Sequence, residues 1–139
     1  MALSTKGIED LLVTKVHNAV AAFALYANFA SIDYRTIETL PAALVMLSAD
    51  EATEVRSRLI SRETYQIVVI TRKGQTVEAS MPAGLCDAVR NAIHGKNWGY
   101  DDIDPFQYLG RELVDYEGEN IAYALKFQTT HALAISSAS

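Results

Sequence analysis

The feature that most constrains the fold of this chain is a run of four β-branched residues, Ile67-Val68-Val69-Ile70. Branching at Cβ disfavours a helix and suits the pleated surface of a sheet. The run is the strongest β signal in the sequence and predicts a strand over 65–71. Because an isolated strand is not stable, other segments must supply its partners.

The segments before this strand are candidate partners. A continuous apolar run over 42–47, led by a proline, has the length of a buried strand. Residues 48–51 are polar and are expected to turn, and 54–61 alternates like a strand. A tight turn at 61–64 would make a hairpin with the strand above; the alternative is one long, bent ribbon. The mixed pattern of 28–40 indicates a loop or an irregular edge strand.

The last third of the chain predicts a hairpin with strands over 106–116 and 121–128 and a turn at 115–120 that contains Gly118. The second strand alternates strictly, with Ile121, Tyr123, Leu125 and Phe127 on one side and Ala122, Ala124, Lys126 and Gln128 on the other. This alternation indicates one buried face. Residues 132–139 are expected to form a frayed or partner-dependent tail.

Helical periodicity occurs in two segments. The first follows a period near 3.6 over 8–23, with Ser4 or Thr5 placed to cap it. Its other side is rich in alanine, so we expect a helix buried on more than one side. The second begins at Met81-Pro82 and ends at Gly95, since glycine readily adopts the left-handed conformation after a last turn. Its apolar stripe consists of Leu85, Val89, Ala92 and Ile93.

These elements predict an α+β fold with a mainly antiparallel sheet, two helices packed on it and the order α-β-β-β-α-β-β. The 139 residues suit one domain, 1–139, and half of them are hydrophobic, enough for a core without a disulfide or metal. The formal charge of −5 argues against binding nucleic acid by phosphate neutralisation. A lone cysteine fits a reducing cytoplasm, and without a signal-peptide pattern or a membrane-spanning run we expect a soluble protein.

The sequence offers little for catalysis or metal binding. None of the three histidines, His17, His94 and His131, lies at i, i+4 with another histidine or a carboxylate in a ligand-like pattern, and Cys86 has no partner cysteine. No glycine-rich phosphate loop is present. The aspartates of 101–104 lack the pattern of a calcium loop and are more simply a solvated acidic loop. We therefore expect no enzyme activity, no metal and no cofactor. A pocket that paired Cys86 with His94 or His17 would revive an enzyme hypothesis.

Basic and aromatic residues supply the candidate contact sites. Three arginines lie on the candidate hairpin, and Arg56 and Arg58 would project together because residues two apart on a strand share a face. They fit an exposed strand protected from aggregation by charge, or a surface for an acidic neighbour such as another copy. The aromatic residues suit interface anchors and a core equally well. The candidate interface residues are Arg56, Arg58, Arg62, Trp98, Tyr100, Phe106, Arg111 and Tyr116.

Two regions in the second half of the chain carry a family resemblance. The second predicted helix reads Leu85-Cys86-Asp87-Ala88-Val89-Arg90-Asn91-Ala92-Ile93-His94-Gly95, and Trp98 follows it. The final hairpin reads Phe106-Gln107-Tyr108-Leu109-Gly110-Arg111-Glu112-Leu113-Val114-Asp115-Tyr116-Glu117-Gly118, then Ala122-Tyr123-Ala124-Leu125-Lys126-Phe127-Gln128-Thr129. With the preceding helix, proline-led strand and β-rich centre, these runs resemble the tail terminator and neck proteins of Mu-like contractile-tailed phages.

The resemblance implies a hexameric ring that caps the tail tube, ends its growth and offers a joining surface for head connector proteins. The implied partners are other copies of the chain, tail tube and sheath proteins, and the connector, in a virion assembled in the host cytoplasm. DNA would pass without specific binding through a lumen of negative or neutral potential. The alternatives are another tail or baseplate component, a subunit of a phage-derived injection device, or a small cytoplasmic ligand-binding or regulatory α+β domain.

Overall fold

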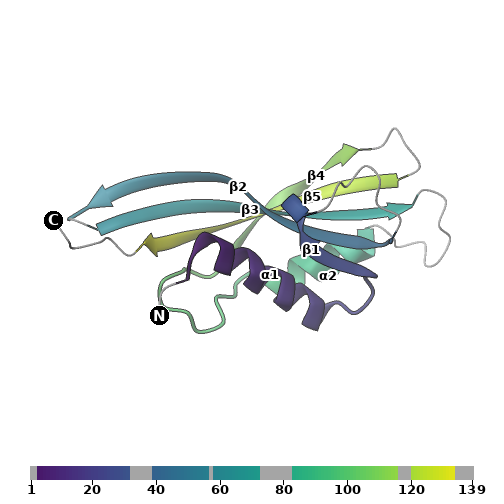
Figure 1. Ribbon diagram of the computed structural model, residues 1–139, viewed down its shortest axis with the longest axis horizontal. Coiled ribbons are helices and arrows are strands. Elements are labelled where there is room, and N and C mark those ends of the chain that lie inside the picture. Colours follow the sequence, from purple (N-terminus) through teal and green to yellow (C-terminus); the bar gives the residue numbers. More distant parts are fainter. Residues whose placement is uncertain (1–2, 32–38, 57, 73–82, 116–119, 134–139) are drawn as a thin grey trace.

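The computed structural model describes residues 3–31, 39–56, 58–72, 83–115 and 120–133. Within these residues, five strands form one sheet, and two α-helices lie against one of its faces (Figure 1). The elements are α1 (Thr5–Ala19), β1 (Leu25–Asn28), the 3-10 turn η1 (Phe29–Ser31), β2 (Ala42–Val55), β3 (Arg58–Arg72), α2 (Ala83–Ile93), β4 (Gln107–Asp115) and β5 (Asn120–Leu133). The predicted α+β class and the order α-β-β-β-α-β-β are confirmed.

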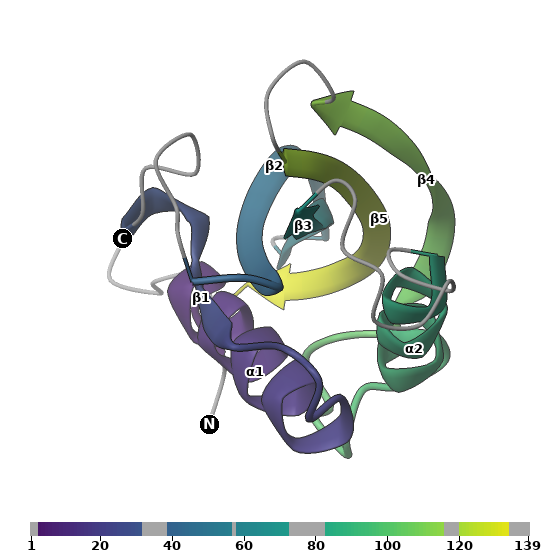
Figure 2. The same cartoon turned by 90° about the vertical axis from the view of Figure 1, so that its right-hand side faces the viewer.

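The strands are arranged in the order β1-β2-β3-β5-β4. The pairs β2–β3, β3–β5 and β5–β4 are antiparallel, whereas the short β1 runs parallel to the start of β2. The sheet is therefore mixed but mainly antiparallel, as predicted. Figure 2 shows β1 and β4 on opposite sides of the strongly twisted sheet, where they form its two borders.

Helix α1 packs on the sheet through one stripe. Ser4 caps it by accepting a hydrogen bond from the Gly7 N–H at 2.9 Å, which confirms one of the two predicted caps. The helix ends at Ala19, and Ala21 and Ala22 are exposed, so the predicted helix to residue 23, buried on more than one side, is wrong. Val20 has an extended backbone, and the chain beyond it turns back toward the sheet. Val20 and Phe23 are therefore buried although they lie outside the helix.

The predicted turn at 48–51 is wrong, and at 61–64 the tight turn is wrong while the alternative of one continuous ribbon is confirmed from Arg58 onward. Residues 48–51 lie within β2, and 61–64 lie within β3; the chain turns at Arg56, whose φ of 50° falls in the left-handed region. The polar residues 48–51 are tolerated in β2 because they are exposed where the hairpin extends beyond the helices, as Figure 1 shows. Strands β2 and β3 pair from Ala42↔Ile70 to Val55↔Arg58 and form one long hairpin, which is interrupted by a bulge between Leu47 and Ala49.

The main core lies between the sheet and the two helices, with fully buried Tyr65, Phe127 and Leu125 at its centre. A second, smaller cluster on the other face contains Ala122 and Ala124, so the prediction that only one face of this strand is buried is wrong there. Leu25, Ala27, Phe29 and Leu40 pack against that cluster, and β1 and η1 therefore act as its cover.

The second helix follows the sequence-based prediction where the structure describes it. In α2, Leu85, Val89 and Ile93 are buried as predicted, and Gly95 follows the helix with a φ of 80°. The predicted start at Met81-Pro82 lies outside the described residues, as do residues 116–119 of the turn predicted at 115–120 and residues 134–139 of the predicted tail. Strand β5 continues to Leu133, so residues 132 and 133 belong to the strand and not to the predicted tail. Within the described chain, neither helix is long and apolar enough to cross a membrane.

Candidate functional site

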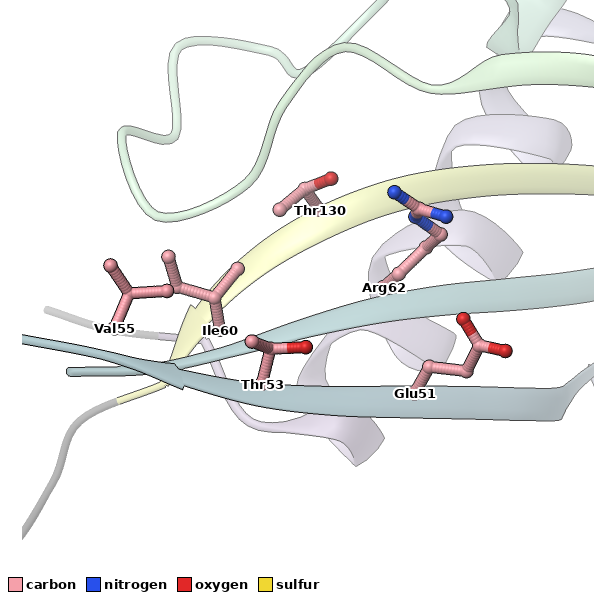
Figure 3. Close-up of a pocket in the computed structure, with 6 residues that line it drawn as sticks. All are labelled: Glu51, Thr53, Val55, Ile60, Arg62 and Thr130. Atoms are coloured by element: carbon pink, nitrogen blue, oxygen red, sulfur yellow. The ribbon is translucent and has the colours of Figure 1, made fainter.

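The part of the sheet that extends beyond the helices is the most distinctive surface of the molecule. We call it the arm and define it as residues 48–55 of β2, 58–64 of β3 and 128–133 of β5. Its face directed away from the helices carries a pocket of about 290 Å³ (Figure 3). The pocket is lined by Glu51, Thr53, Val55, Ile60, Arg62 and Thr130. We call this the outer face of the arm.

The predicted arginines are divided between the turn and this outer face. Arg56 occupies the turn, so the prediction that it projects with Arg58 from one strand is wrong. Arg58 and Arg62 are four residues apart on β3 and share its outer face, and Glu51 lies opposite Arg62 in the strand register. All three arginines are exposed. The outer face thus combines both signs of charge with the apolar side chains of Val55 and Ile60.

The opposite, inner face of the arm holds a buried polar cluster that sequence reasoning missed. Glu63 is 1% exposed and His131 is 0% exposed, and the His131 Nδ1 lies 3.2 Å from both Glu63 carboxylate oxygens. The Nε2 of His131 lies 3.4 Å from the Asp102 carboxylate, and Tyr65 donates its hydroxyl proton to Glu63 at 2.7 Å. Burial, together with the hydrogen bond to Glu63, raises the pKa of Tyr65 and keeps the phenol as a donor.

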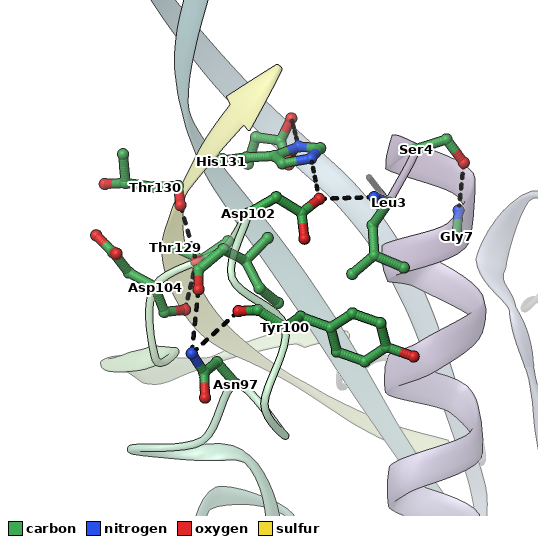
Figure 4. Close-up of polar contacts among 12 residues, drawn as sticks. Leu3, Ser4, Gly7, Asn97, Tyr100, Asp102, Asp104, Thr129, Thr130 and His131 are labelled. Atoms are coloured by element: carbon green, nitrogen blue, oxygen red, sulfur yellow. Dashed lines mark hydrogen bonds and ion pairs between the residues drawn. The ribbon is translucent and has the colours of Figure 1, made fainter. Parts of the chain in front are cut away.

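The acidic loop after α2 covers this cluster (Figure 4). The Asp102 carboxylate accepts a hydrogen bond from the Leu3 N–H at 2.6 Å, and the Asp102 carbonyl accepts one from the Ala132 N–H at 2.8 Å. Asp104 N–H donates to the Thr130 carbonyl, and the Thr129 hydroxyl donates to the Asp104 carbonyl. The loop therefore serves as a clamp on the arm, and no group of side chains within the described ranges is suited to hold a metal ion.

The predicted aromatic residues mostly face inward. Phe106 is 1% exposed and contacts the rings of Tyr65 and Trp98, so its side chain is enclosed and is not a surface anchor. Trp98 and Tyr100 are half-buried against the core, and the Lys15 ammonium lies 5.5 Å above the Trp98 ring. Tyr116 lies outside the described residues. The aromatic signal therefore belongs largely to the core.

Strand β4 is the second notable surface. It borders the sheet, and its side chains Leu109, Leu113 and Val114 are 48%, 47% and 49% exposed. Arg111, which was predicted as an interface residue, forms an ion pair with Asp87 of α2 at 3.1 Å. Its guanidinium is thus tied to α2, and the three apolar side chains are exposed without such an ion pair.

The candidate nucleophile is enclosed. Cys86 is 1% exposed, and burial raises the pKa of its thiol, which leaves little reactive thiolate at neutral pH. His94 accepts a hydrogen bond from the Tyr108 N–H, and the His17 ring lies against the Tyr26 ring at 4.4 Å. Both histidines therefore make structural contacts in the described part of the chain.

Comparison with known proteins gives a likeness of fold. No family model matches the sequence, and no curated protein matches it. Among solved structures, a chain from the virion of a native gene transfer agent particle matches with a TM-score of 0.55 and 14% identity, over 87% of this chain and 94% of that one. The protein therefore shares its fold, nearly end to end, with a chain of a virion particle.

Proposed function

We propose that this protein is a structural component of a phage-like virion and acts as a tail terminator. In this role, identical copies close into a ring on the end of the tail tube, stop its growth and present a joining surface to the head connector. The observation that carries the proposal is the fold likeness to a chain of a virion particle, which spans nearly the full length of both chains. The resemblance in the second helix and final hairpin points to the terminator role.

The surfaces of the molecule are suited to assembly. An arm that extends beyond the helices and a border strand with half-exposed leucine and valine side chains are available for contacts between copies. Head-to-tail contacts between identical subunits give a closed ring when the rotation between neighbours closes. The formal charge of −5 makes the assembled ring acidic on average, and an acidic lumen repels DNA phosphates and lets the genome slide.

A catalytic role has less support. The buried polar cluster contains Glu63, His131 and Asp102, but Glu63 and His131 are enclosed, and the cluster is used to hold the loop to the arm. The pocket on the outer face is open, small and lined by both charges, unlike the deep apolar pocket of a ligand-binding domain. Another tail or baseplate position is the remaining alternative, since the fold likeness does not distinguish positions within a virion.

The terminator role is tested by deleting the gene in the genome that encodes the protein and imaging the particles by electron microscopy. We expect tails of uncontrolled length that carry no heads, because nothing ends the tube or joins it to the connector. Normal-length tails attached to heads would contradict the proposal. Tails that are missing altogether, with free heads, would instead indicate a baseplate or initiation role.

Assembly is tested separately by light scattering of the purified protein across concentration, alone and with purified tail tubes. We expect a defined oligomer under at least one of these conditions, and images of rings at tube ends. A strict monomer at every concentration, both alone and with tubes, would contradict ring formation.

A further inference from the structure

The arm has an unpaired edge. Strand β1 pairs with β2 only from Ala42 to Val45, and residues 48–55 of β2 pair with β3 on one side alone. In the part of the chain that the structure describes, no strand lies on their other side. The backbone N–H and C=O groups on this side are therefore available to extend the sheet. We call residues 48–55 the arm edge.

Strand β4 provides a second open edge at the opposite border of the sheet. It pairs with β5 along one side, and within the described residues its other side has no strand partner. Leu109 and Val114 are the extra residues at its two register shifts, and both are about half-exposed, as is Leu113. An edge strand of this length with three half-exposed apolar side chains invites pairing with another chain unless it is covered.

The two edges are compatible in direction and length. Successive pairs β2–β3, β3–β5 and β5–β4 are all antiparallel, so β2 and β4 run in opposite directions. If neighbouring copies are related by rotation about an axis inclined to the strands by well under a right angle, the arm edge of one copy meets β4 of the next antiparallel. The arm edge has eight residues and β4 has nine, and the exposed Val55 would lie near the exposed Leu109 of β4.

The strand registers give the tilt that such a ring requires. Arg111 at the middle of β4 is aligned with Val45 of β2 through the paired residues Leu125 and Ile67. The middle of the arm edge lies about six residues beyond Val45 along β2. At roughly 3.3 Å per residue this offset is about 20 Å, over four strand spacings of about 4.8 Å each. The strands would be inclined by roughly 45° to the ring axis, close to the inclination of about 35–45° found in closed barrels.

We propose that the arm edge of one copy pairs with strand β4 of the next copy, so that the sheets of all copies join into one continuous closed sheet. The occupant of each open edge is thus a second copy of this chain, bound head to tail. This inference rests on the proposed ring and assigns the two surfaces that build it. A two-fold dimer, which would pair β4 with β4, is the competing arrangement.

Cross-linking tests the pairing. One variant carries Ala49→Cys on the arm edge and another carries Leu113→Cys on β4, which the centred antiparallel register places opposite each other; both sites are in strands, and both residues are exposed. The two proteins are mixed, allowed to assemble and treated with a short bismaleimide. We expect a covalent dimer only in the mixture. The wild-type protein controls for the buried Cys86, and Lys6→Cys on the exposed side of α1 controls for random collision.

The outcomes separate the pairing from the assembly. A covalent dimer formed by the Leu113→Cys variant alone would overturn the head-to-tail arrangement in favour of β4 with β4. An oligomer seen by light scattering that yields no mixed product would overturn the pairing while leaving the proposed ring in place. A protein that stays monomeric alone and with tail tubes would overturn both. A double variant, Ala49→Cys with Leu113→Cys, should yield ladders up to the size of the ring.

Discussion

The two halves of the long sheet are built on different principles. In the body of the sheet, which consists of residues 42–47, 65–71 and 121–127, apolar side chains fill the space beneath both helices and under β1. In the arm, the same three strands carry buried polar groups on the inner face and exposed charges on the outer face. The body is held by the removal of apolar surface from water, and the arm by specific polar contacts to one loop.

This difference shows how one hairpin serves two purposes. The body requires no particular partner, because nearly any tight apolar packing stabilises it. The arm depends on a few directional contacts, from Asp102 and Asp104 to residues 129–132, and leaves its outer face and edge free. The surface that we propose for assembly is thereby kept extended without a hydrophobic core of its own.

The largest expected effect comes from the body. Phe127→Ala removes a fully buried ring that packs on Tyr108, and we expect the free energy of unfolding to fall by about 4 kcal/mol. Urea unfolding followed by circular dichroism measures this change. Val55→Ala on the arm is the matched control and should alter stability by less than about 0.5 kcal/mol. Equal losses from both variants would remove the distinction between body and arm.

The polar cluster of the arm gives the next largest effect. Glu63→Leu leaves the Tyr65 hydroxyl and the His131 ring without their acceptor, and we expect a loss of about 3 kcal/mol in the free energy of unfolding. Glu51→Leu, on the exposed outer face of the same arm, is the control and should be nearly neutral. If Glu63→Leu proved stabilising, the cluster would not be what holds the inner face.

A smaller and more local effect is expected from the clamp loop. Asp102→Ala removes the acceptor for the Leu3 N–H and the carboxylate beside His131, which should cost about 2 kcal/mol. Hydrogen exchange should accelerate in residues 128–133 and leave 65–71 protected. The exposed neighbour, Asp101→Ala, should leave the exchange pattern as it is. Faster exchange in the body as well would mean that the arm and body open as one unit.

The smallest effect on stability is expected on the outer face of the arm. Arg62→Ala changes an exposed side chain and should shift the free energy of unfolding by no more than about 0.5 kcal/mol. If the arm is an assembly surface, the same variant should still lower the fraction of oligomer seen by light scattering. Lys6→Ala, on the exposed side of α1, is the matched charge control. Unchanged assembly in the Arg62 variant would exclude this face from the contact.

Local sequence patterns determined the elements whose cause is local. The β-branched run placed β3, the spacing of Leu85, Val89 and Ile93 placed α2, and Ser4 marked the start of α1. Each of these signals acts within a few residues, through rotamer restriction, one-sided burial or a cap. The fold class and the order of the elements followed from them.

Only the tertiary structure decided where the long hairpin turns and what its polar residues do. Residues 48–51 and 61–64 have the composition of turns, yet cross-strand pairing keeps them extended because each backbone group gains a partner in the neighbouring strand. Glu63 and His131 are 68 residues apart and gave no spacing signal, because β3–β5 pairing alone places them two pairs from each other. The same long-range pairing left the arm edge and β4 without a strand on one side in the described residues. The sequence by itself could not single out these two edges among the candidate contact surfaces.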